Sequence, residues 1–85
     1  MTLSTRGYDP AVGVSDLGDV WALTKNGEWL RARLWTHPDG WELRLYRGER
    51  ELRRHVLADQ NRVTRYATRW RLNAESQGWK MPEPT

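Results

Sequence analysis

The chain has no cysteine among its 85 residues. It therefore forms no disulfide, and no thiolate is available to bind a metal ion or attack a substrate. Such a composition is common in reducing compartments. The sequence also lacks an apolar run of the roughly 20 residues that a membrane-spanning helix needs, and its first residues contain no hydrophobic segment typical of a signal peptide. We therefore expect a soluble, unexported, cytoplasmic protein with no membrane partner.

Residues suited to catalysis are equally scarce. The two histidines, His37 and His55, have no neighbouring nucleophile at a spacing that would build a catalytic pair. Two histidines without cysteine are too few for a zinc site. The seven glycines fall at expected turns and helix ends, and none builds a phosphate-binding loop. We predict a non-enzymatic protein with no catalytic residue, no metal, no cofactor and no small-molecule substrate.

Phenylalanine is absent too, whereas tryptophan occurs six times. A single domain of this length buries only about 60–65% of the surface that its unfolded chain exposes, so a few indole rings must supply much of the core. Residues 1–19 carry one basic and three acidic side chains, a net charge of −2, whereas residues 20–79 carry twelve basic and seven acidic ones, a net charge of +5. Most of the basic residues are arginine, which suits phosphate and aromatic partners, although GC-rich genomes also favour arginine codons.

Four strands and one helix are predicted. The strands cover residues 20–25, 28–36, 41–46 and 51–57, separated by turn signals such as Asn26-Gly27. Asp59 is placed to cap a helix of about nineteen residues that ends before Gly78 in a Schellman motif. We therefore predict an α+β fold, a two-layer ββββα domain over residues 19–79. The domain is a four-stranded antiparallel meander with one C-terminal helix on one face. An N-terminal arm (1–18), flexible or folded back on the sheet, precedes it, and a C-terminal tail (80–85) follows it.

The three hairpin turns each fix a strand register, and together they predict one apolar face. This face comprises Trp21, Leu23, Leu30, Ala32, Leu34, Trp41, Leu43, Leu45, Leu52 and Val56, with Arg54 as its one charged member. At helical spacing, Val63, Tyr66, Ala67, Trp70 and Ala74 form the stripe that covers it. A secondary basic ridge, Arg62, Arg65 and Arg69, runs beside the stripe. The ridge is an ordinary solvated flank, or else Asn61 and Arg62 near the helix N-terminus help to hold a phosphate, which Asp59 at the cap would repel.

The opposite face of the sheet is predicted to be open. The register brings Arg33, Arg44 and Arg53 into one row, and Trp35, Glu42 and His55 into the next. Because like charges opposed across strands repel, this row needs nearby carboxylates, aromatic rings or a bound polyanion. The candidate residues for binding nucleic acid or another partner are Trp29, Arg31, Arg33, Trp35, Arg44, Tyr46 and Arg53.

Three interpretations of this face are open. It is a solvated surface neutralised by its own glutamates and rings, a nucleic-acid surface with arginines on phosphates and rings on bases, or an interface to a protein partner or second copy anchored by Trp29 and Trp35. Exposed tryptophan favours a partner, and nucleic acid is the preferred hypothesis. The layout resembles that of plant domains that lay a three-stranded sheet on DNA, without a shared motif. Alternatively the arm, through residues such as Leu3, Tyr8 and Val12, covers the two tryptophans.

Overall fold

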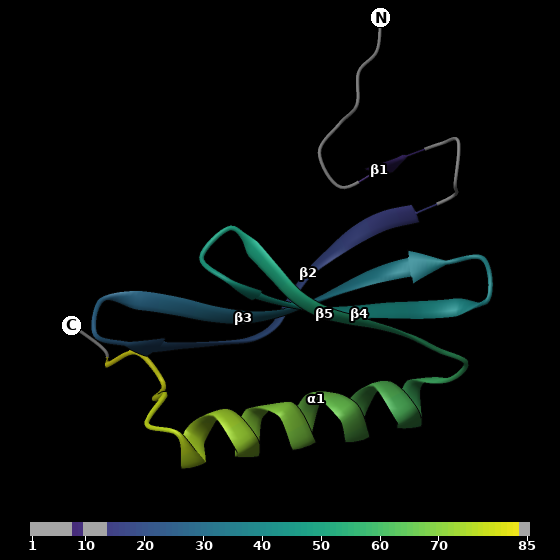
Figure 1. Cartoon of the computed structure of the whole chain (residues 1–85). Helices are drawn as coiled ribbons and strands as arrows, with labels where there is room; N and C mark the ends of the chain where they lie inside the picture. Colours follow the sequence, from purple (N-terminus) through teal and green to yellow (C-terminus); the bar gives the residue numbers. More distant parts are fainter. Residues whose placement is uncertain (1–7, 10–13, 84–85) are drawn as a thin grey trace, which may run out of the picture.

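The computed structural model of the protein describes residues 8–9 and 14–83. Five strands and one helix follow in chain order: β1 (Tyr8–Asp9), β2 (Val14–Lys25), β3 (Glu28–His37), β4 (Gly40–Arg47), β5 (Arg50–Leu57) and α1 (Gln60–Ser76). The strands form an antiparallel meander in sequence order, and α1 lies along one face of the sheet (Figure 1). The predicted four-stranded meander with one C-terminal helix is confirmed, and the two-residue β1 is added at its edge.

The core lies between α1 and the sheet face that the turns predicted to be apolar. Leu23, Ala32 and Leu43 are completely buried in it. The helix contributes the predicted stripe, with Val63, Ala67, Trp70 and Ala74 buried and Tyr66 packed against them. The indole N–H of Trp21 donates to the backbone carbonyl of Ala67 at 2.8 Å, so this large ring joins the two layers without leaving its polar atom unpaired.

Both predicted helix ends are confirmed. The side chain of Asp59 accepts a hydrogen bond from the backbone N–H of Arg62, as an N-cap does. At the other end Gly78 adopts φ +99°, and Trp79 N–H donates to the carbonyl of Ala74, which completes the Schellman motif. Lys80, the first residue of the predicted tail, then pairs with Thr24 through two backbone hydrogen bonds of 2.7 and 2.9 Å.

Strand β2 is longer than predicted, because it begins at Val14 and includes the last residues of the predicted arm. Two β-bulges interrupt its pairing with β3, one between Asp16 and Gly18 and one between Asp19 and Trp21. Each bulge inserts a residue and so reverses the alternation of side chains. As a result both aspartates lie on the open face while Trp21 still reaches the core. Residues 1–7 and 10–13 of the arm, which carry the predicted contact of Leu3 and Val12 with the open face, lie outside the described residues.

The predicted register of β5 is wrong by one residue over most of the strand. A bulge between Leu45 and Tyr46 leaves Leu52 without a partner on β4. Beyond it Arg53 stands opposite Leu45, and His55 stands opposite Leu43, both on the face toward α1. Leu52 and Val56, predicted to be buried, are 44% and 46% exposed, and Leu57 takes their place in the core. Arg54, predicted to intrude on the apolar face, faces the open side.

Among the described residues, no helix is both long and apolar enough to cross a membrane. The same part of the chain contains no group of three side chains placed to hold a metal ion.

Candidate binding groove on the open sheet face

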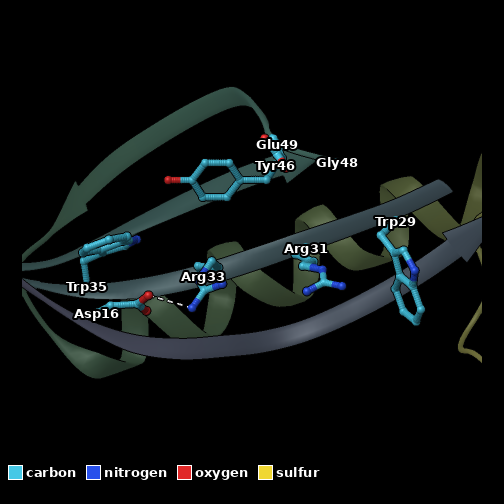
Figure 2. Close-up of a pocket in the computed structure, with 8 residues that line it drawn as sticks. All are labelled: Asp16, Trp29, Arg31, Arg33, Trp35, Tyr46, Gly48 and Glu49. Carbon is cyan, nitrogen blue, oxygen red and sulfur yellow. Dashed lines mark hydrogen bonds and ion pairs between the residues drawn. The ribbon is translucent and has the colours of Figure 1, made fainter. Parts of the chain in front are cut away.

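The open face carries a groove that follows strand β3. Trp29, Arg31, Arg33 and Trp35 occupy alternate positions of β3, so all four project to this side. They line a groove of about 510 Å³ together with Tyr46 of β4, Asp16 of β2, and Gly48 and Glu49 of the β4–β5 turn. Figure 2 shows Trp29 at one end, Trp35 and Asp16 at the other, and the two arginines between them.

The groove gathers five of the seven residues predicted to bind a partner. Arg44 lies beside it, opposite Arg33 on β4, and its guanidinium stacks over the ring of Trp35 at 4.1 Å from the ring centre. Arg53 does not belong to this surface. The β5 bulge turns it toward α1, where its guanidinium lies 5.6 Å from the ring of Trp70. Arg54 replaces it, so the row of three arginines is Arg33, Arg44 and Arg54.

Two tryptophans of the groove are held by stacked arginines. The guanidinium of Arg31 lies 5.0 Å from the ring centre of Trp29, which is 38% exposed. Trp35 is half-buried beneath Arg44. Contacts of this kind contribute roughly 0.5–1 kcal/mol each at exposed positions. They therefore fix the orientation of the rings more than they stabilise the fold.

At the β2 side of the groove, two aspartates neutralise the arginines of β3. Arg33 forms an ion pair with Asp16 at 2.6 Å and lies 3.6 Å from a carboxylate oxygen of Asp19. Arg31 also lies 3.6 Å from Asp19. The aspartates were not predicted as site residues, since their position depends on the two bulges of β2. The negative charge of residues 1–19 was the available signal.

At the β5 side, two glutamates neutralise the other arginines. Glu42 is 5% exposed and accepts a 2.7 Å hydrogen bond from Arg44. Arg54 donates two hydrogen bonds of 2.7 and 2.8 Å to Glu51 and lies 3.7 Å from Glu42. The hydrogen bond from Arg54 lowers the pKa of Glu51 below its ordinary value. The four arginines of the open face thus meet four carboxylates of the same face, which leaves these eight groups with no net charge.

Two buried N–H donors of the groove have no hydrogen-bond acceptor in the described part of the chain: Nε of Arg33 and Nε1 of Trp35. Arg33 Nε forms an ion pair with a carboxylate oxygen of Asp19. The distance between these two atoms is 3.6 Å, which is too long for a hydrogen bond. Figure 2 shows the indole nitrogen on the side of the Trp35 ring that faces Arg33. A buried donor without an acceptor costs about 1–3 kcal/mol. Both atoms are enclosed by the protein, so this cost is part of the packing around Arg33 and Trp35.

The predicted basic ridge lies on the other side of the molecule. Arg62, Arg65 and Arg69 line a separate groove between α1 and the edge of β5. Arg62 forms a 3.5 Å ion pair with Asp59, and Arg69 lies 5.4 Å from the ring centre of Tyr66.

Comparison of the chain with protein-family models, with curated proteins and with solved structures finds no match.

Proposed function

We propose that the chain is a small non-enzymatic binding module and that the groove on its open face binds an extended segment of a partner protein. The observation that carries this proposal is the pairing of the four open-face arginines with carboxylates of the same face, beside three aromatic rings that line the groove. The rings offer apolar contact area, and the paired charges give the surface polarity without a net charge that would require a polyanion.

The dimensions of the groove suit a polypeptide. Trp29 and Trp35 are six residues apart on one strand, which corresponds to about 20 Å. An extended segment of about six residues spans that length. Grooves lined by aromatic rings are a recurring means of recognising extended polypeptides. Trp29, which is 38% exposed, offers such a segment its most accessible ring.

Single-stranded nucleic acid is the competing candidate, favoured by the net charge of +3 and by rings on which bases stack. Proteins bind nucleic acid largely through basic side chains, which neutralise phosphates and release the small counterions condensed around them. Arg33, Arg44 and Arg54 already donate hydrogen bonds to carboxylates, so a phosphate would compete with Asp16, Glu42 and Glu51 for them. The geometry therefore favours the polypeptide.

The proposal is tested by selecting binders from a random library of displayed peptides about twelve residues long, sufficient to overfill the groove. The affinity of the selected peptides is then measured for two groove variants. Trp29→Ala removes an exposed anchor, and Trp35→Ala removes the ring at the other end of the groove. We expect each variant to weaken binding about tenfold, which corresponds to about 1.4 kcal/mol.

Leu72→Ala provides the matched control, because Leu72 is 55% exposed on α1, on the other side of the sheet. It should leave the affinity unchanged. If the library yields no peptide whose binding depends on Trp29 or Trp35 while the protein stays folded, the groove does not bind polypeptides.

A further inference from the structure

Strand β5 forms one edge of the sheet in the described part of the chain, since it pairs with β4 alone. An edge strand leaves a row of backbone N–H and C=O groups without partners and is a template for another strand. Every residue of β5 except Leu57 is exposed, and the apolar Leu52 and Val56 are 44% and 46% exposed. The edge is therefore accessible along most of its length.

A groove of about 350 Å³ runs between this edge and α1. His55 and Val56 line it from β5, and Tyr66 with the basic ridge residues lines it from the helix. The ring of His55 packs 5.1 Å from that of Tyr66, which joins the strand to the helix at this point. A chain laid along the β5 edge would thus have one row of its side chains beside α1.

The charge of this groove differs from that of the open face. Within the described residues, Arg65 and Arg69 of this groove have no carboxylate at ion-pair distance, and neither does Arg53 of β5, whereas Arg62 pairs with Asp59. These arginines project from β5 and α1, and Arg53 lies over Trp70 of the helix. Among the described basic side chains without an ion pair, four lie on β5 or α1, namely Arg50, Arg53, Arg65 and Arg69, whereas Lys25 and Lys80 lie elsewhere.

We propose that the β5 edge binds an acidic, extended segment of a partner protein by strand addition. Backbone hydrogen bonds to the edge provide affinity, and acidic side chains against Arg65 and Arg69 provide specificity. Arginines along an edge repel a second copy of the same strand, which is a known protection against self-association. The same charges attract a strand of opposite sign. This site is separate from the open-face groove and does not depend on its function.

The test uses a capped peptide of about ten residues with alternating glutamate and valine, long enough to cover β5. Three further probes accompany it: the same peptide with alternate amides methylated, a peptide with lysine in place of glutamate, and an oligothymidine of similar length. We expect the acidic peptide to bind and the lysine peptide not to bind. Methylation should weaken binding at least about tenfold, because it removes backbone donors.

The protein variant that tests the site is Arg65→Glu combined with Arg69→Glu, on the exposed surface of α1. It should weaken binding of the acidic peptide about tenfold or more. Arg71→Glu is the matched control, because Arg71 lies on the opposite flank of α1 and pairs with Glu75; it should have less than about a twofold effect. Equal binding of the methylated peptide, tighter binding of the oligothymidine, or equal effects of the two variants would each overturn strand addition of an acidic segment.

Discussion

At the scale of single residues, the open face depends on a few carboxylates that keep neighbouring arginines together. Glu42 is the most buried of them and contacts both Arg44 and Arg54. The alternation of tryptophan and arginine on β3 was predictable, because a strand places every second side chain on one face. The position of Asp16 and Asp19 on the open face was not predictable, because it depends on the two bulges of β2. The sequence therefore predicts which side chains line the groove better than it predicts the carboxylates that pair with them.

Glu42→Ala tests the contribution of the buried carboxylate. Without Glu42, Arg44 has no carboxylate partner of its own. It then remains half-buried between two other arginines, Arg33 and Arg54. We expect the free energy of unfolding, measured by urea denaturation, to fall by about 2–3 kcal/mol, between the values typical of surface and buried pairs. Glu28→Ala is the control, since the Glu28–Arg47 pair is half exposed and its loss should matter much less. Equal losses from the two variants would show that Glu42 has no special role.

The pKa of Glu51 gives a prediction for the dependence of stability on pH. The hydrogen bond from Arg54 lowers this pKa in the folded state. The pair therefore stabilises the fold above the pKa of an unfolded glutamate, about 4.3, and this contribution is lost as the pH falls through the lower folded value. We expect Glu51→Gln to reduce the loss of stability between about pH 5 and pH 3, as followed by urea denaturation. Glu49 lies in the neighbouring β4–β5 turn and has no ion pair in the described chain, so Glu49→Gln should behave like the wild type. Identical pH profiles for all three proteins would refute the prediction.

At the scale of elements, turns and caps were predicted well and bulges were not. Asn26-Gly27, Asp59 and Gly78 each have local chemistry that fixes the chain direction, so the hairpins and both helix ends follow from the sequence. The bulge opposite Leu45 has no such local signal. It is favoured by the tertiary fit, since the shifted register buries Leu57 under α1 and leaves Arg53 beside Trp70. This one-residue shift moved Arg53 from the predicted binding surface to the other side of the sheet.

Gly40 tests how closely the β3–β4 hairpin must approach the junction of β5 and α1. It adopts φ +135°, and a Cβ atom there would overlap the carbonyl oxygen of Leu57. We expect Gly40→Ala to lower the free energy of unfolding by at least about 2 kcal/mol, measured by urea denaturation, because strain and backbone overlap act together. Gly48→Ala is the control: Gly48 also has a positive φ, of +61°, but has open space around it. Its cost should be only about 1–2 kcal/mol, and a smaller cost at Gly40 than at Gly48 would contradict the close approach.

At the scale of the whole molecule, α1 divides the surface into two regions of different charge. The face away from the helix has an aromatic groove whose arginines are paired with acids, whereas Arg65 and Arg69 beside the β5 edge lack such partners in the described residues. The net charge of +3 predicted a basic protein, but not where the unpaired charge would lie. That location depends on the pairing of strands distant in sequence.

We propose that the open-face groove binds a polypeptide in preference to nucleic acid. The most direct test follows tryptophan fluorescence during titration with a library-selected peptide, a single-stranded oligonucleotide and a duplex of mixed sequence, at about 50 and 200 mM salt. We expect the peptide to change the fluorescence with an affinity that varies less than about threefold between the two salt concentrations, and the oligonucleotides to bind weakly, because the groove arginines are already neutralised. Tight binding of either oligonucleotide that is lost steeply at the higher salt, and abolished by Trp29→Ala, would instead identify the groove as a nucleic-acid site.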